Sequence, residues 1–185
     1  MVTIAIVYHS GFGHTQVQAE SVAKGVQAVE GVEAKLMAVD QIDWELLLKA
    51  EGIIFGSPTY MGGVSAPFKQ FMDESSKAWF EHKWQDKIAA GFTNSASQSG
   101  DKLNTLIQMA VFAAQQGMIW VSLGLPPGNN STHGSPEDLN RCGSYLGAMA
   151  QSNADQGPEV VPPESDKKTA EHLGKRVATA ALRWN

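Results

Sequence analysis

Residues 2–16 read Val2-Thr3-Ile4-Ala5-Ile6-Val7-Tyr8 followed by His9-Ser10-Gly11-Phe12-Gly13-His14-Thr15-Gln16. The first run is apolar, rich in β-branched residues and ended by glycines, which predicts a strand buried on both faces. From Thr15 the apolar spacing becomes that of a helix, with Ala19, Val22, Ala23 and Val26 on one side. Such a helix points its free N–H groups and its positive dipole end at whatever lies above the strand. We therefore expect an anion at this turn.

The turn lacks the features of two common phosphate loops. No Lys follows Gly13, as a nucleoside-triphosphate loop requires, and Gln16 stands where a dinucleotide loop has its third glycine. The hydroxyls of Ser10 and Thr15 and the backbone amides can still hold a phosphate monoester by hydrogen bonds and the helix terminus. The alternative is an ordinary capped turn between a strand and a helix.

Length and composition favour one domain spanning residues 1–185, large enough to bury a substantial core. The net charge is −5 and the basic residues are scattered, so we expect no nucleic-acid or membrane partner. Cys142 is the single cysteine, and the histidines have no metal-ligand spacing, which excludes an internal disulfide and gives no metal site. No apolar run approaches the length of a membrane span, and no leader precedes the first strand, so we expect a cytoplasmic protein.

Further along the chain, apolar runs alternate with helical patterns. Strands are expected at residues 32–39, 52–56, 87–92 and 118–123. Helices are expected at 43–50, from Ser65 through Trp79, at 103–114 and from Ser165 onward. Residues 124–163 form a long segment without periodicity, in which residues 143–151 are apolar enough to pack.

This alternation predicts an α/β fold, a doubly wound parallel sheet of five strands with a long ordered segment after the fifth. Three strands end in small polar turns, at residues 10–15, 57–63 and 93–99. In the strand order 2-1-3-4-5 these turns lie side by side at the carboxyl edge, where ligands of such sheets bind. A phosphorylated planar ligand lying across the three turns is the resulting hypothesis.

Four motifs, Y-H-S-G-F-G-H-T, G-S-P-T-Y-M-G, F-T-N-S-A-S-Q-S-G and Q-G-M-I-W-V-S-L-G, occur in an order and spacing that resemble the flavodoxin-like NAD(P)H:quinone oxidoreductases of the WrbA type. The resemblance covers most of the chain. It implies a flavodoxin-like fold, FMN as cofactor and NAD(P)H as transient electron donor. It also implies a homodimer or homotetramer in which neighbouring chains close the flavin site.

The resemblance implies a role for three groups of residues. The phosphate of FMN would be wrapped by Ser10, Gly11, Phe12, Gly13, His14 and Thr15. The ring system would be flanked by Pro58, Thr59, Tyr60, Met61 and Gly62 on one side and by Thr93, Asn94, Ser95, Ala96, Ser97, Gln98 and Ser99 on the other. The resemblance also places Trp79 on the substrate side and Phe12 at the dinucleotide site. His133 and Tyr145, in the long segment where this chain differs from better-known members, are further candidates for the substrate side.

One site departs from that pattern, and two other residues admit more than one interpretation. Gln115 and Gln116 stand where better-known members carry a histidine that reaches the flavin; Gln can donate a hydrogen bond but does not titrate. His133 is either an exposed loop residue or a group near the flavin. Arg141 either meets the flavin edge or the phosphates of the dinucleotide, or is simply solvated. No catalytic acid, base or nucleophile is assigned, because the flavin carries the chemistry.

Two functions follow from these features. The first is two-electron reduction of quinones by NAD(P)H through bound FMN, favoured by Phe12, Tyr60 and Trp79 as stacking surfaces and by the mild acidity of the chain. The alternative is a flavodoxin-type carrier that passes single electrons between protein partners. A flavin-free regulatory protein is a third class, left if FMN does not bind.

Overall fold

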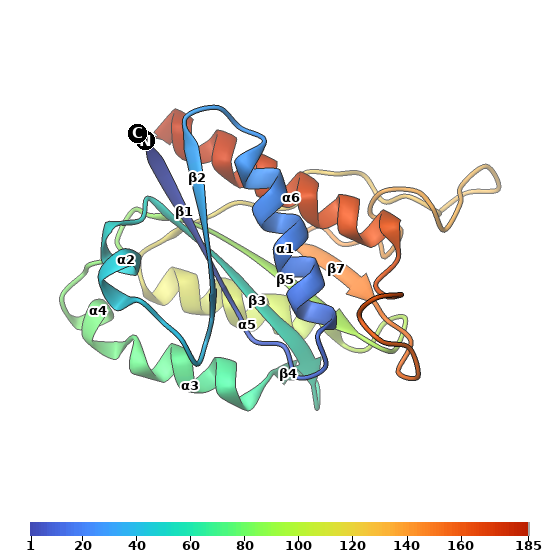
Figure 1. Ribbon diagram of the computed structural model, residues 1–185, viewed down its shortest axis with the longest axis horizontal. Helices are drawn as coiled ribbons and strands as arrows, with labels where there is room; N and C mark the ends of the chain where they lie inside the picture. The colour runs from blue at the N-terminus through green and yellow to red at the C-terminus, as the bar shows by residue number, and fades with distance from the viewer. Residues whose placement is uncertain (185) are drawn as a thin grey trace.

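A computed structural model of the chain, describing residues 1–184, has a parallel sheet at its centre (Figure 1). Strand β1 (Val2–Tyr8) is buried among neighbours, and α1 (His14–Gln27) follows it, as the first run of sequence predicts. Within the described residues the main path of the sheet is β2-β1-β3-β5-β6, each pair parallel. This is the predicted strand order.

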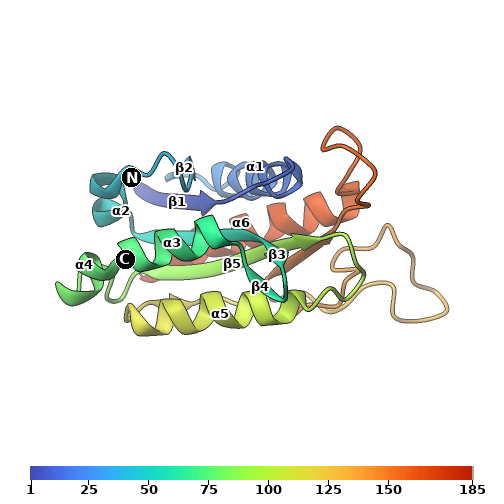
Figure 2. The same ribbon diagram turned by 90° about the horizontal axis from the view of Figure 1, so that it is seen from below.

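The other elements have the following bounds: β2 Val32–Ala38, α2 Trp44–Lys49, β3 Gly52–Tyr60, β4 Gly63–Val64, α3 Ala66–Glu74, α4 Ser76–Phe80, β5 Ile88–Ser95, α5 Lys102–Gln115, β6 Ile119–Trp120, β7 Ala148–Gln151 and α6 Glu164–Trp184. Two apolar cores form on the two faces of the sheet. One lies beneath α1 and α6, and the other lies beneath α2, α3 and α5; Figure 2 shows how these helices are arranged about the sheet. The second core contains the buried rings of Phe55, Phe71 and Trp84.

The predicted fifth strand is wrong in its extent, because two separate segments share its place. β6 pairs with the beginning of β5, and β7 pairs with its end, also in parallel. The Val121 amide still donates to the carbonyl oxygen of Ala89 in β5 at 2.7 Å. The chain then leaves the sheet near Gly124, which has a φ of 68°, and Pro126. β7 returns through Gly147, where a Cβ atom would lie 2.2 Å from the carbonyl oxygen of Gly91. Close backbone contact therefore fixes where the strand resumes.

Three other boundaries differ from expectation. β3 continues through Pro58 to Tyr60 and folds back onto β4, so the turn consists of Met61 and Gly62 rather than residues 57–63. The helix predicted from Ser65 through Trp79 is divided at Ser75 into α3 and α4. β5 likewise continues to Ser95, beyond the predicted end of the strand. Paired neighbours keep these polar residues extended, which their composition alone does not indicate.

The segment between β6 and β7 projects beyond the sheet in both ribbon views. Its base is fixed by Asn140, whose side-chain amide donates to the carbonyl oxygens of Leu125 and Ser144 at 3.2 and 2.8 Å. Asp138 accepts from the amide of Ser135 at 2.7 Å and closes a turn over residues 135–138. Across residues 1–184, no helix has both the length and the apolar character that a membrane span requires.

Candidate cofactor site

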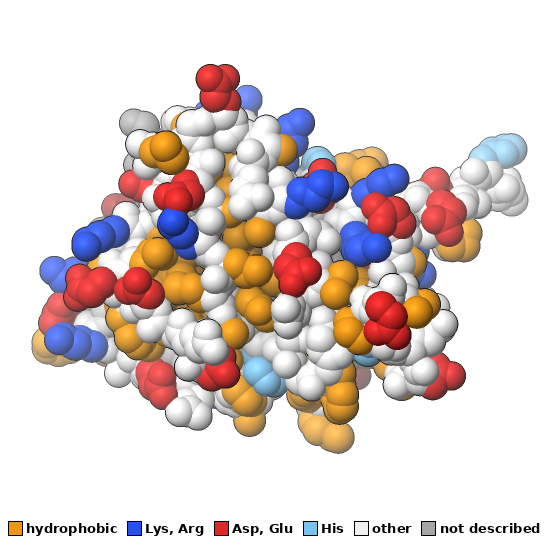
Figure 3. All heavy atoms as spheres, viewed as in Figure 1, with side chains coloured by type: hydrophobic (Ala, Val, Ile, Leu, Met, Phe, Trp, Pro, Cys, Tyr) orange, Lys and Arg blue, Asp and Glu red, His pale blue; other side chains and the backbone are white. Residues whose placement is uncertain are grey.

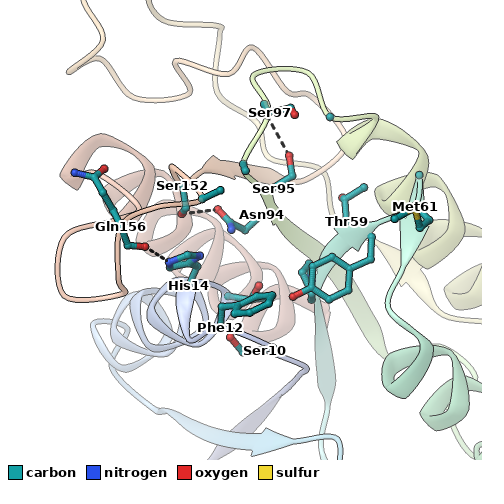
Figure 4. A pocket seen from close by; sticks show the side chains of 18 of the residues that line it. Ser10, Phe12, His14, Thr59, Met61, Asn94, Ser95, Ser97, Ser152 and Gln156 are labelled. Carbon is teal, nitrogen blue, oxygen red and sulfur yellow. Dashed lines mark hydrogen bonds between the residues drawn. The ribbon is translucent and has the colours of Figure 1, made fainter.

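A cavity of about 600 Å³ opens at the carboxyl ends of β1, β3 and β5, the edge at which the three polar turns were expected to meet. It is lined by Ser10, Gly11, Phe12, His14, Thr15, Pro58, Thr59, Tyr60, Met61, Gly62, Asn94, Ser95, Ala96, Ser97, Gly100, Ser152, Ala154, Gln156 and Gly157 (Figure 4). Its volume lies in the range of small-molecule and cofactor sites.

The turn between β1 and α1 presents backbone N–H groups to this cavity. Gly13 is the N-cap of α1 with a φ of 87°, and it has no side chain that could cap the helix. The hydroxyl of Ser10 accepts from the amide of Gln16, in the first turn of α1, at 3.2 Å, and this bond holds the turn against the helix. Thr15 is buried in the first turn. The remaining free N–H groups of this helix terminus and the helix dipole give this end of the cavity a positive potential, which suits an anion.

The described lining of the cavity contains no Lys, Arg, Asp or Glu side chain. His14 is its one histidine among those residues, and the Nε2 atom lies 2.8 Å from the carbonyl oxygen of Gln156. This contact ties the turn between β1 and α1 to residues 152–157. An anion would therefore be held by neutral donors and the helix terminus, without a paired cation.

The middle of the cavity wall is tied to the interior by threonine hydroxyls. The Oγ1 atom of Thr59 lies 2.8 Å from that of Thr93 and 2.8 Å from that of Thr105. These side chains belong to β3, β5 and α5, so the three elements that meet at the cavity are joined by one buried chain of hydrogen bonds. Thr93 itself is fully buried and stands behind the wall.

Two aromatic rings stand at the mouth of the cavity. Phe12 and Tyr60 meet edge to face, with ring centroids 6.5 Å apart and an interplanar angle of 74°. Both are exposed, and Met61 beside them is fully so. Partial burial raises the pKa of the Tyr60 hydroxyl above its ordinary value. Gly11 packs beneath this ring: a Cβ atom there would lie 2.5 Å from the Tyr60 hydroxyl oxygen.

The fourth side of the cavity comes from residues 152–157, which the sequence analysis did not assign. The hydroxyl of Ser152 donates to the Oδ1 atom of Asn94 at 2.9 Å, as Figure 4 shows. The preceding residue, Gln151, donates to the carbonyl oxygen of Ala96 at 2.8 Å. A short apolar run followed by small polar residues was the available indication, the same pattern as at the other three turns. The brevity of β7 concealed it.

Most of the predicted cofactor residues line the cavity, and the others adjoin it in sequence: Gly13, Thr93, Gln98 and Ser99. The three predicted substrate residues lie elsewhere within the single chain. Trp79 borders a hollow between α3, α4 and α5 together with Gln115 and Gln116. Tyr145 borders another hollow beside α5. His133 is exposed on the projecting segment.

Two further residues have roles that the sequence did not indicate. Arg141 is neither solvated nor turned to the cavity: its Nε and Nη2 atoms donate to the two carboxylate oxygens of the buried Asp166 at 2.8 and 2.7 Å. This forked pair raises the pKa of Arg141 further, chiefly through its hydrogen bonds to that carboxylate. Gln116 is buried and donates to the Ser75 hydroxyl at 2.8 Å. It therefore serves the packing of α5 in this chain.

Comparison with known proteins gives a consistent family. The model of the NADPH-dependent FMN reductase family matches residues 27–125. "Flavodoxin FldP" of Pseudomonas aeruginosa is 44% identical over 179 residues, covering 94% of this chain and 93% of that protein. An "NAD(P)H dehydrogenase (quinone)" of Archaeoglobus fulgidus is 33% identical over 205 residues, covering 98% of each.

A solved structure agrees with these sequence matches. The flavodoxin, WrbA-like protein from Agrobacterium tumefaciens superposes with a TM-score of 0.80 at 42% identity, covering 100% of both chains. The doubly wound sheet, the polar turns at its carboxyl edge and these relatives all agree. The chain belongs to the NADPH-dependent FMN reductase family of flavodoxin-like oxidoreductases.

Proposed function

We propose that the protein binds FMN in the cavity at the ends of β1, β3 and β5 and uses it to reduce quinones by two electrons from NAD(P)H. One observation carries the proposal: one cavity combines the N-terminus of α1, which suits an anion, with an exposed aromatic pair, Phe12 and Tyr60. FMN combines one phosphate with one flat ring system, which is the same combination.

The residues present fit this cofactor at its phosphate end. The hydroxyls of Ser10 and Thr15 flank the free N–H groups at the start of α1. Gly11 has no room for a side chain, so at this residue the ligand would contact the backbone. A phosphate held this way needs no lysine, in agreement with the uncharged lining among the described residues.

Bound FMN would supply the redox chemistry, by accepting two electrons from the dinucleotide and passing them to the quinone. The side chains of this protein would orient the reactants. Phe12 and Tyr60 offer ring surfaces against which a flat substrate can stack, and Asn94 and Ser95 offer polar groups on the opposite wall. The turn at Met61 and Gly62 covers the side between them.

The substrate side is completed, in our proposal, by a second copy of the chain. Trp79, Tyr145 and His133 lie outside the cavity of their own chain. They border α5 or the projecting segment, and in a homodimer or homotetramer they would approach a neighbouring cavity. The relatives named as quinone dehydrogenases support a quinone as the acceptor.

A one-electron carrier is the second candidate, favoured by the 44% identical relative named as a flavodoxin. Carriers of that kind generally use a strongly charged rim to steer their partners. The described lining of this cavity is uncharged and the net charge of the chain is mild, at −5, which favours the reductase.

Stopped-flow mixing of the FMN-loaded protein with NADH or NADPH, followed by benzoquinone, tests the proposal. We expect rapid loss of the flavin absorbance with either dinucleotide and its return with the quinone, at two electrons per flavin. No bleaching by either dinucleotide, with single-electron steps in a chemical redox titration, would favour the carrier. Failure of the protein to quench FMN fluorescence would reject both.

A further inference from the structure

Lys102 is placed where a lysine is unfavourable on two counts. It is the first residue of α5, so its positive charge lies at the positive end of the helix dipole. It is also 1% exposed, and lysine is among the residues least often buried. Asp101 before it has a φ of 54° and makes no side-chain cap. A residue that breaks local rules without helping its own helix is expected to serve a site nearby.

The partners of the ammonium group belong to the loop that forms one wall of the cavity. The Nζ atom donates to the Ser95 hydroxyl at 3.0 Å, to the Ser97 carbonyl oxygen at 2.8 Å and to the Gln98 carbonyl oxygen at 3.0 Å. An ammonium has three donors, and here all three are used. A buried ammonium group without hydrogen bonds would destabilise the folded protein. The loop therefore stabilises the charge of Lys102, and Lys102 in turn stabilises the conformation of the loop.

These bonds fix the direction in which the loop presents its backbone. The carbonyl groups of Ser97 and Gln98 point to the ammonium, and in a trans peptide the following N–H points the opposite way. The amides of Gln98 and Ser99 therefore face away from Lys102. Gly100 completes the turn, since a Cβ atom there would lie 2.3 Å from the Ser95 hydroxyl oxygen.

The charge of Lys102 also lacks a direct counter-ion. Among the described residues, the ion pairs do not include Lys102. Asp166 is close enough to act on it electrostatically, but its two carboxylate oxygens are taken by Arg141. The cavity lining is itself uncharged. Lys102 thus places a positive charge behind one wall of a neutral cavity.

We propose that Lys102 is a positioning residue of the cofactor site, which holds the 95–98 loop in shape and favours an anionic occupant over a neutral one. The inference rests on the proposed function for the identity of the occupant, because reduced FMN carries more negative charge than oxidised FMN. Lys102 would therefore raise the reduction potential of the bound cofactor.

Two variants separate the effects, and a third is the control. Lys102→Met removes both the donors and the charge, whereas Lys102→Gln removes the charge and keeps two donors. Lys87→Met is matched: the Lys87 ammonium also donates to backbone carbonyls, those of Leu48 and Ala50, but at the opposite end of β5. Folding of each variant is checked by its urea midpoint.

The first measurement is made on the full chain without cofactor. We expect NMR order parameters of the amides at residues 96–99 to be about 0.85 in the wild type and below about 0.6 in Lys102→Met, with Lys87→Met unchanged. Because no FMN is present, this result does not depend on the proposed function. Unchanged order in Lys102→Met would overturn the positioning role.

The second measurement compares the affinities for oxidised and reduced FMN. In both Lys102 variants we expect the ratio of the affinity for reduced FMN to the affinity for oxidised FMN to fall about tenfold. This is the effect expected when one unit charge that does not contact the cofactor is removed. For a two-electron couple this is about 30 mV lower in potential. An unchanged preference in Lys102→Gln would overturn the electrostatic role, and a wild type that binds no FMN would reject the proposed function and this role together, while the loop measurement stands.

Discussion

Ser10 and Thr15 stand on either side of the turn that presents free N–H groups to the cavity. Because each hydroxyl is expected to donate to a charged phosphate, we expect the Ser10→Ala/Thr15→Ala pair to weaken FMN binding by about 2 to 4 kcal/mol. Fluorescence quenching of FMN measures this loss. The matched control is Ser131→Ala/Thr132→Ala on the projecting segment, where both residues are exposed and outside the cavity. Equal affinities in the two pairs would contradict the assignment.

At the same scale, the sequence indicated residues whose chemistry is local and missed those whose role depends on distant partners. Ser10, Gly11 and Thr15 are recognisable because strand, turn and helix follow each other directly. Ser152 reaches Asn94 across 58 positions, and Arg141 reaches Asp166 across 25. No local pattern contains such pairs. Lys102 was overlooked for a related reason, since a lysine at a helix start is normally solvated and gives no sign of being buried.

At the scale of elements, the sequence predicted the strand order but not the division of the fifth strand. Residues 118–123 are apolar except for Ser122, yet just Ile119 and Trp120 form β6. The place beside the end of β5 goes to β7, whose approach depends on Gly91 and Gly147 lacking side chains. Competition between two segments for one strand edge is a tertiary effect, and propensity cannot decide it. The cavity's fourth side was missed as a consequence.

Helices α1 and α6 lie with their backbones in direct contact, and the sequence patterns do not predict this contact. A Cβ atom on Gly174 would lie 2.0 Å from the carbonyl oxygen of Val22, and one on Gly25 would lie 1.9 Å from that of Glu171. Figure 1 shows the two helices side by side over one face of the sheet. Glycine in each helix lets the two backbones touch.

Gly174→Ala should therefore destabilise the protein, although alanine favours a helix by about 0.5 to 1 kcal/mol over glycine. Forcing the helices apart costs about 1 to 3 kcal/mol, so we expect a net loss in the free energy of unfolding measured in urea. Lys175→Ala, at the exposed neighbouring residue, is the control and should change stability by less than about 0.5 kcal/mol. A Gly174→Ala variant more stable than the wild type would show that the crossing is looser than described.

At the scale of the whole molecule, charge is distributed unevenly over the helices. On the face seen in Figure 3, acidic and basic side chains are interspersed. On α5, by contrast, Lys102 is the one charged residue of the helix and it is buried. The outward side of α5 carries Leu103, Ile107 and Val111, spaced one turn apart and exposed. A surface helix with an uncharged, apolar outer stripe is typical of an interface.

We expect this stripe to meet a second copy of the chain, because an uncharged face can pack against itself without like-charge repulsion. The hollows beside it hold Trp79 on one side and Tyr145 on the other, which extends the apolar surface along both edges of α5. A stable interface needs about 1,000 Å² or more of buried surface, more than one helical stripe provides, so these flanks must take part. The same contact would bring the predicted substrate residues toward a neighbouring cavity.

Analytical ultracentrifugation at micromolar concentration tests this arrangement. The wild type should sediment at twice or four times the 19.9 kDa mass of the chain. Ile107→Glu/Val111→Glu should sediment as a monomer, because four or more buried, unpaired carboxylates would oppose the contact. Leu182→Glu/Val160→Glu is the control: these residues are 41% and 55% exposed, against 43% and 62% for Ile107 and Val111, and lie outside α5. A wild-type monomer would refute the oligomer, and dissociation by both pairs would place the interface elsewhere than α5.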